Sequence, residues 1–317
     1  MRKSWFITVI LVLVTVWGFQ NCAPGANFTE SASTDPEAQG ETPTPPAPPT
    51  SSLPITACGA NKVRSPNGAC ICDFNNGYYE NASGLCEKAS AIQDLCAPRP
   101  ARCGSVGQPA TGYVFDFNSA SLSSSEVSFS STASRLTRLS GSQSLVQESV
   151  CGTNRKVLQF GRGAGLKFIA GLVAQNYSVA VLFRFNYQDA ANCSGTWARI
   201  LDLKQNSVDT GLYMYGSGTS RNLQFYNFNS GTARVSSNQY AWVTYSKNGG
   251  EITGFVNRQL QWSYGDSGSW STLNSSKEMI FFKDDTQVAN EECSGAVAKI
   301  VVFNQALSKD QAECLAF

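Results

Sequence analysis

Four carboxylates stand close together near the end of the sequence, in the stretch "KDDTQVANEEC". Asp284 and Asp285 are adjacent, and Glu291 and Glu292 follow as a second adjacent pair. Carboxylate and carbonyl oxygens are the ligands that calcium takes in proteins, so this loop is a candidate calcium site. Calcium is the single cofactor that the sequence suggests, and nothing indicates that one is required.

A structural corner is the alternative explanation for the same four acids. One acid would pair with Arg199 or Lys283, another would cap a turn, and the others would face solvent. Ion pairs at a surface of this kind contribute at most about 1 kcal/mol. We favour the corner over the calcium site, and both interpretations stay open at the level of sequence.

Catalysis by a pair of carboxylates is a third possibility. Glycoside hydrolases place two carboxylates on either side of the bond that they cleave, and side chains two residues apart share one face of a strand. Adjacent acids such as Asp284 and Asp285 would point to opposite faces. The chain also has no histidine, which excludes Ser-His-Asp and Cys-His nucleophiles and zinc held by histidine. We therefore predict no enzymatic activity, with glycan hydrolysis as the least favoured alternative.

Three aromatic residues stand in segments where complete burial is not expected. Trp197 lies close to Cys193, and Tyr264 and Trp270 lie in "YGDSGSWS". An aromatic side chain on a loop can stack against the face of a sugar ring, and partial packing under the loop is the alternative. Trp197, Tyr264 and Trp270 are the candidate ligand-binding residues.

Short apolar runs separated by Gly, Ser and Asn follow one another from about Gly107. Runs such as "YSVAVLFRFNY", "ARILDLK" and "AWVTYSK" are typical of strands. In "YSVAVLFRF" both alternating sets are apolar, so this strand should be covered on both faces. About twelve such runs without a long helical period predict an all-β fold, a two-sheet antiparallel jelly-roll sandwich over residues 105–317.

The order of these segments resembles the laminin G-like, concanavalin A-like jelly roll. The segments concerned are "YSVAVLFRF", "ARILDLK" followed by "GLYMYGS", "ITGFVNRQLQ" and the end "SGAVAKIVVFNQALSKDQ", in which Ser308 can cap a short helix. The resemblance implies a binding or scaffold domain, often extracellular, with carbohydrate or protein ligands and sometimes calcium at its rim. It also places the loops of Cys193 and Cys293 close together, which implies a Cys193–Cys293 disulfide and leaves Cys151 with Cys314. Cys293–Cys314 is the alternative.

Residues 58–104 form a separate cysteine-rich segment that is too short for a sufficient apolar core, so disulfides should stabilise it. Its stretch "CICDFNNGYYENASGLC" resembles the C-terminal half of an EGF-like module. By that analogy Cys72 pairs with Cys86. For the remaining cysteines we expect the pairs Cys58–Cys70 and Cys96–Cys103, although six cysteines allow 15 connectivities.

The N-terminus carries the signature of an exported protein. Residues 1–21 begin with Arg2 and Lys3 and continue with an apolar run, which is typical of a secretory signal, with an uncleaved anchor as the alternative. The end of this run, "FQNC", resembles the cleavage site of bacterial lipoproteins, which makes Cys22 the lipidated residue. Residues 22–57 are rich in Pro, Thr and Ser and read as an extended linker. Without Cys22 the chain has ten cysteines, an even number that suits an oxidising compartment.

Together these features predict a lipoprotein anchored at the outer membrane or cell surface. Its sandwich would bind an extracellular glycan or protein, with a role in cell adhesion. The formal net charge of +1 gives no attraction to nucleic acid. A purely structural envelope protein is the main alternative, and a glycoside hydrolase is the less favoured one.

Overall fold

The computed structural model describes residues 58–64, 70–72, 78–80, 86–88, 92–110, 112–171, 175–193, 195–216, 218–226 and 230–317. All of them belong to one compact unit, Thr56–Phe317. The expected signal at 1–21, the expected lipidation site Cys22 and the linker 22–57 lie outside the described residues. Among the described residues, none of the helices has the length and apolarity needed to cross a membrane.

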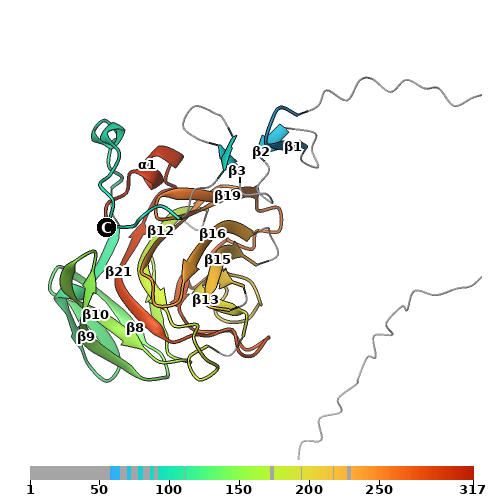
Figure 1. Cartoon of the computed structure of the whole chain (residues 1–317). Coiled ribbons are helices and arrows are strands. Elements are labelled where there is room, and N and C mark those ends of the chain that lie inside the picture. Colours follow the sequence, from blue (N-terminus) through green and yellow to red (C-terminus); the bar gives the residue numbers. More distant parts are fainter. Residues whose placement is uncertain are drawn as a thin grey trace, which may run out of the picture. The chain divides into compact units, whose positions relative to one another are not determined.

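Most of the described chain forms two antiparallel sheets that face each other (Figure 1). The predicted two-sheet antiparallel β-sandwich is therefore confirmed. The first sheet has this strand order: β19 (Gln259–Gly265), β18 (Glu251–Val256), β17 (Ala241–Asn248), β12 (Asn176–Phe185), β21 (Gly295–Phe303), β10 (Thr153–Phe160) and β9 (Gln143–Val150), with β5 (Tyr113–Asp116) also paired to β21.

The second sheet carries the candidate site. Its strand order is β16 (Ser230–Ser236), β15 (Ser220–Phe225), β14 (Leu212–Tyr215), β13 (Trp197–Asp202), β20 (Glu278–Phe281), β11 (Leu166–Ile169), β8 (Thr132–Arg138), β7 (Glu126–Phe129) and β6 (Ala120–Leu122). A short 3-10 turn, η3 (Phe117–Ser119), joins β5 to β6.

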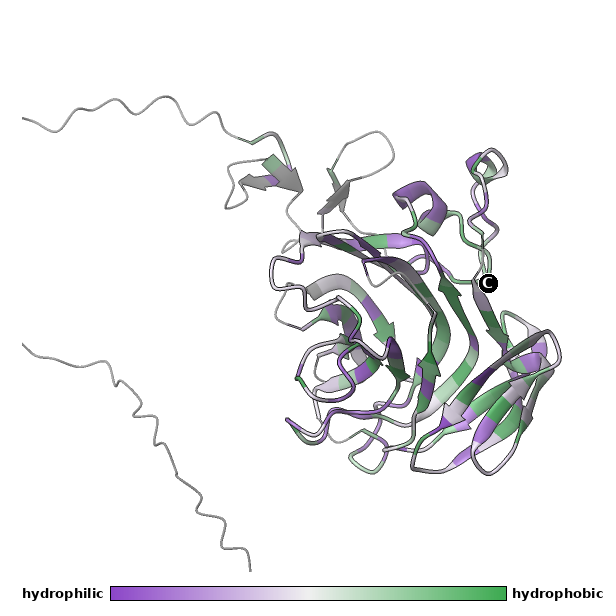
Figure 2. Ribbon diagram, turned by 180° about the vertical axis from the view of Figure 1, so that it is seen from behind, coloured by the Kyte–Doolittle hydropathy of each residue, from purple (hydrophilic) through white to green (hydrophobic). Residues whose placement is uncertain are grey.

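Alternation of apolar and polar side chains explains how the two sheets face each other. In β15, Leu223 and Phe225 enter the core between the sheets, while Asn222 and Gln224 alternate with them on the opposite face. The interior strands are predominantly apolar in colour, and the loops are more polar (Figure 2). The second sheet therefore has an outer face that is free to carry polar and aromatic side chains.

Strand β12 is buried on both of its faces, as its sequence predicts. Val179, Val181 and Phe183 belong to the core between the sheets. Ala180 and Leu182 belong to a second apolar cluster, together with side chains of the C-terminal segment. This segment includes α1 (Lys309–Glu313), which begins with a capping box in which the Ser308 hydroxyl accepts from the Gln311 N–H.

The cysteine-rich segment forms two short hairpins. Strands β1 (Lys62–Arg64) and β2 (Cys70–Cys72) pair, as do β3 (Tyr78–Glu80) and β4 (Cys86–Lys88). The expected Cys58–Cys70 disulfide is present. Cys86 is also disulfide-bonded. Its expected bond to Cys72 stays a prediction, because the side chain of Cys72 lies outside the described part.

Two of the expected disulfides are wrong. The expected pairs Cys96–Cys103 and Cys151–Cys314 are replaced by Cys96–Cys151 and Cys103–Cys314, with Cα–Cα distances of 5.1 and 5.2 Å. Proximity in the sequence favoured Cys96–Cys103, and Cys151–Cys314 was the pair that remained once the resemblance had joined Cys193 to Cys293. Neither consideration shows that the chain between Cys96 and Cys103 lies against the sandwich.

Residues 92–104 pack on the outer face of the first sheet. Leu95 is buried in the second apolar cluster, and Arg258 Nη2 donates to the Leu95 carbonyl oxygen at 2.9 Å. Asn257 Nδ2 donates to the Gln93 carbonyl oxygen at 2.8 Å. The segment, which ends in the 3-10 helix η2 (Ala101–Gly104), is therefore joined physically to the sandwich, although the sequence groups it with the cysteine-rich hairpins.

Candidate functional site: an aromatic face above a buried arginine

Arg199 is a fully buried cation in the middle of the second sheet. It lies in β13, where Ala198 and Ile200 enter the core and Trp197 and Arg199 alternate with them on the outer face. Its guanidinium carbon lies 4.5 Å from the centre of the Tyr213 ring, the geometry of a cation–π contact. The aromatic ring and the carboxylates described next remove the guanidinium from water.

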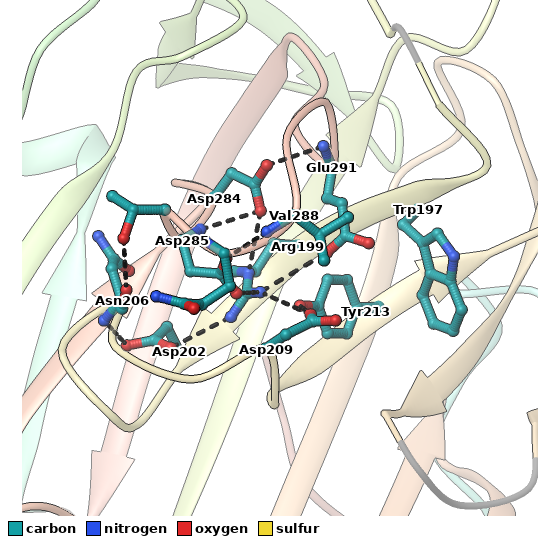
Figure 3. A network of polar contacts seen from close by, with 12 residues as sticks. Trp197, Arg199, Asp202, Asn206, Asp209, Tyr213, Asp284, Asp285, Val288 and Glu291 are labelled. Atoms are coloured by element: carbon teal, nitrogen blue, oxygen red, sulfur yellow. Dashed lines mark hydrogen bonds and ion pairs between the residues drawn. The ribbon is translucent and has the colours of Figure 1, made fainter. Parts of the chain in front are cut away.

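Five carboxylates surround the guanidinium of Arg199 (Figure 3). We call these residues and Arg199 the arginine cluster. Its ion pairs are Nη1 with Asp202 at 3.1 Å, Nη2 with Asp209 at 3.4 Å, Nε with Asp284 at 3.6 Å, Nη2 with Glu291 at 3.6 Å, and Nη2 with Asp285 at hydrogen-bond distance.

The carboxylates also fix the loops that carry them. Asp284 Oδ2 accepts from the Glu291 N–H at 2.9 Å, and Asp285 Oδ1 accepts from the N–H groups of Gln287 and Val288. The Arg199 N–H donates to the Glu291 carbonyl oxygen at 2.9 Å. The acidic loop between β20 and β21 is thus held against β13, as a structural corner requires.

A disulfide joins the same loop to the chain before β13. Cys193 and Cys293 are bonded, as expected, with a Cα–Cα distance of 4.2 Å, and the two residues also form a β-bridge. The acidic loop therefore has two independent attachments, one covalent and one through Arg199. This limits its freedom to move relative to β13.

Three of the four acids predicted from the sequence lie together in the arginine cluster. The fourth, Glu292, points elsewhere and lies next to Gly163. The contributions of Asp202 and Asp209 were not predicted, because both acids stand isolated in the sequence. Asp202 is three residues after Arg199 across a register shift in β13, and the loop after that strand returns Asp209 to the guanidinium.

Burial dominates the electrostatics of the arginine cluster. Loss of water raises the pKa of Glu291 to about 7 and that of Asp284 to about 6. The pKa of Asp202 is raised for the same reason. One guanidinium faces five carboxylates, so the cluster keeps an excess of negative charge even when one or two of the acids are protonated.

The candidate cation position is shared with the arginine. Ligand oxygens of Asp209, Asp285 and Glu291 lie within 4.8 Å of one another, and Arg199 Nη2 pairs with all three. The guanidinium thus supplies positive charge at the point where these carboxylates converge.

An aromatic cluster lies beside the arginine cluster on the outer face of the second sheet. The ring of Trp197 lies 4.1 Å from Tyr215, 5.2 Å from Tyr213 and 5.4 Å from Tyr226, centre to centre. Tyr213 is buried, whereas Trp197, Tyr215 and Tyr226 are partly accessible. Tyr213 connects the two clusters, because its hydroxyl donates to Asp209 Oδ1 at 3.1 Å.

The pairing of the strands extends this surface with polar side chains. Trp197 stands opposite Tyr215, Tyr215 opposite Asn222, and Asn222 opposite Arg234, in one row across four strands. In the neighbouring row Tyr213 stands opposite Gln224. We call the surface formed by Trp197, Tyr213, Tyr215, Tyr226 and Asn222 the aromatic face.

Two acceptor oxygens at this surface have no hydrogen-bond partner among the described residues. They are Asn222 Oδ1 and Glu291 Oε2, which lies on a residue that is 5% exposed and has Arg199 Nη2 as an ion-pair partner at 3.6 Å, beyond hydrogen-bond distance. The hydroxyl of Tyr213 has a single proton, which it donates to Asp209. Buried acceptors without a donor are rare and costly, so these two oxygens mark a shortage of hydrogen-bond donors beside the surface.

The structure does not bring Tyr264 and Trp270 to the aromatic face. Tyr264 lies in β19 of the first sheet, stacked on Trp262 with ring centres 5.1 Å apart, and packs against the core. Trp270 follows β19 in a turn and is 37% exposed. Its backbone N–H donates to Asp266 Oδ1. Of the three aromatic candidates, only Trp197 lies in a set of accessible aromatic residues within the described chain.

No protein-family model matches the chain, and no curated protein matches it in sequence. Solved structures show partial similarity. Domain 4 of AbnA, a GH43 extracellular arabinanase from Geobacillus stearothermophilus in complex with arabinotriose, is 13% identical, with 65% of this chain and 98% of that chain covered and a TM-score of 0.47.

Two further solved structures are similar to parts of the chain. A Trypanosoma rangeli sialidase in complex with sialic acid is 11% identical over 64% of this chain and 32% of its own, with a TM-score of 0.47. The receptor binding domain of botulinum neurotoxin type G is 14% identical over 65% of this chain and 50% of its own, with a TM-score of 0.40. Such low identities and TM-scores assign neither a family nor a ligand to this chain.

Proposed function

We propose that this protein binds an extracellular carbohydrate through the aromatic face, without cleaving it. The observation that carries the proposal is the position of Trp197. This partly accessible side chain lies on the sheet face that points away from the core, and three tyrosines surround it. The aliphatic face of a sugar ring packs on such a surface, and its hydroxyl groups can donate to acceptors at the rim.

The arginine cluster has a supporting role in this proposal. The Arg199 guanidinium lies against the face of the Tyr213 ring. The acidic loop is held to β13 by the hydrogen bond from the Arg199 N–H to the Glu291 carbonyl oxygen. A surface that is already rigid before it binds loses little conformational entropy on binding. The acids of the cluster act here in support of the fold rather than as a catalytic pair.

A glycan array probed with the full-length chain tests the proposal. We expect binding to one class of glycan, a loss of binding in the Trp197→Ala and Asn222→Ala variants, and no release of shorter saccharides from bound glycans. Trp270→Ala is the matched control, because Trp270 is exposed but lies outside the aromatic face. Thermal melting shows whether each variant is folded. An array without any hit, or equal binding by the Trp197→Ala variant, would contradict the proposal.

The laminin G-like architecture remains part of the proposal. It is supported by the acidic loop before β21, the position of that strand inside its sheet, and the capped helix α1 after it. An experimental structure with a different strand order would exclude it. The proposed setting is the bacterial surface, where a lipid on Cys22 and the partial EGF-like module would hold the sandwich outside the membrane for adhesion.

Calcium at the acidic loop is a separate proposal. Asp209, Asp285 and Glu291 offer the oxygens, and Arg199 competes for the same position. If calcium binds, EDTA lowers the melting temperature of the protein and millimolar calcium restores it. Identical melting curves with EDTA and with calcium would exclude a stabilising ion.

A further inference from the structure

We infer that the aromatic face selects a sugar carrying a free ammonium group, such as the glucosamine of a deacetylated glycan. The inference rests on the proposed function and names its ligand class. Two properties of the face support it: the sign of the charge beside Tyr213, and the kind of hydrogen-bonding group that lacks a partner there.

The charge beside the aromatic face is negative. Asp209 and Glu291 both pair with Arg199 Nη2 and lie next to Tyr213 (Figure 3). The single guanidinium is shared with the three other acids of the cluster, so the surroundings of Tyr213 retain net negative charge. Attraction between unit charges a few ångströms apart is substantial at a partly buried site, and a sulfated or carboxylated sugar would be repelled.

Two buried acceptors beside the face lie outside hydrogen-bond distance of a donor in the described part of the chain. Glu291 Oε2 and Asn222 Oδ1 lack hydrogen-bond partners among the described residues. An ammonium group has three N–H donors and no acceptor, so it fits better than an acetamide, which has one donor and one acceptor. Indole and phenol rings such as those of Trp197 and Tyr215 also attract cations to their faces.

Arg199 and Arg234 are the cations near the face that we consider, and each is already paired with other groups of the protein. The Arg199 guanidinium is held by its carboxylates and by the Thr210 carbonyl oxygen, which accepts from Nη1 at 3.0 Å. Arg234 stands at the far end of the row, is exposed, and donates to Ser220 through Nε and Nη2. The ammonium group therefore belongs at the end of the face near Asp209, whose side chain is 19% exposed.

Titration calorimetry on the full-length chain tests this assignment with three disaccharides: the β-1,4 dimer of glucosamine, the β-1,4 dimer of N-acetylglucosamine, and cellobiose. We expect the glucosamine dimer to bind about tenfold more tightly than the other two, which corresponds to ~1.4 kcal/mol. Glu291→Gln and Asp209→Asn remove charge with little change in size. Each should abolish most of this preference, because it lowers the affinity for the glucosamine dimer more than the affinity for cellobiose.

Glu292→Gln is the matched control, because Glu292 is the adjacent acid but lies next to Gly163 outside the cluster. This variant should keep the preference for the glucosamine dimer. Melting temperatures check that all three variants are folded. Equal affinity for the three disaccharides with loss in Trp197→Ala would overturn the ammonium assignment and leave the proposed function intact. Absence of binding to any disaccharide and to the glycan array would overturn both, and an unchanged preference in Glu291→Gln would overturn the role of that carboxylate.

Discussion

At the scale of the residue, Arg199 holds most of the candidate site together. It is completely buried, contacts the Tyr213 ring and faces five carboxylates. Removing two opposite charges from water costs several kcal/mol for each ion, and this cost is recovered only when the partners remain in place. The cluster is therefore sensitive to the loss of its one cation.

We expect Arg199→Met to lower the free energy of unfolding by about 3–5 kcal/mol, because it leaves buried carboxylates without a cation. Denaturation with urea measures this change. Arg135→Met is the control, since Arg135 forms an exposed pair with Glu126 whose loss should cost at most about 1 kcal/mol. If Arg199→Met is as stable as the unmodified protein, the buried carboxylates do not depend on the positive charge of Arg199, which contradicts the prediction.

The raised pKa values of Glu291 and Asp284, about 7 and about 6, also predict how stability depends on pH. Unfolded carboxyl groups titrate near pH 4, so between about pH 4.5 and 7 the folded state holds more protons than the unfolded state. The free energy of unfolding should therefore fall as the pH rises through this window and level off above it. Glu291→Gln should flatten the slope in urea titrations at several pH values. A stability that rises over this interval would contradict the assignment.

At the scale of the element, the segment 92–104 is decisive for the first sheet. It lies on the outer face of that sheet, buries Leu95 and is bonded to the sandwich through Cys96–Cys151 and Cys103–Cys314. The apolar outer face of β12 requires a cover, and this segment supplies it together with the C-terminal residues around α1.

We therefore expect a fragment of residues 56–317 to be markedly more stable than a fragment of residues 105–317. The shorter fragment loses the cover and two disulfides, each of which typically contributes about 2–5 kcal/mol. Thermal melting of the two purified fragments measures the difference. Equal melting temperatures would mean that the sandwich is complete without residues 92–104.

The strands and the helix cap could be predicted from the sequence, whereas two of the disulfides could not. The strands, the double burial of β12 and the Ser308 cap follow from local patterns of period two and from a capping residue, and all are confirmed. The pairing of Cys96 and Cys103 depended on where a segment without apolar periodicity lies in space. Local patterns carry no information about that position, so an expectation based on nearness along the chain named the wrong partners.

At the scale of the whole molecule, the proposed anchor and the proposed binding face lie far apart in the sequence. Residues 1–55 precede the compact unit, and the aromatic face comes from residues 197–226 of that unit. If Cys22 carries the lipid, Cys22→Ser should move the protein from the membrane fraction to the soluble fraction while leaving glycan binding unchanged. Fractionation of cells followed by immunoblotting measures this. Unchanged membrane association of the variant would show that residues 1–21 can anchor the protein without a lipid on Cys22.

Three features could be predicted from the sequence: the class of fold, the acids of the loop before β21, and, through the resemblance to a family, the Cys193–Cys293 pair. These features depend on local periodicity and on the order of segments. The tertiary structure decided what the acids do, because Arg199 and Asp202 of β13 meet Asp209 and Asp285 only when the loop after β13 and the loop after β20 both return to this strand. It also decided that Trp197 belongs with Tyr213, Tyr215 and Tyr226, since their contact depends on the register between β13 and β14 and on the position of Tyr226 directly after β15. The register of paired strands and the positions of the residues that follow them are properties of the folded sheet. They cannot be read from the spacing of residues along the chain.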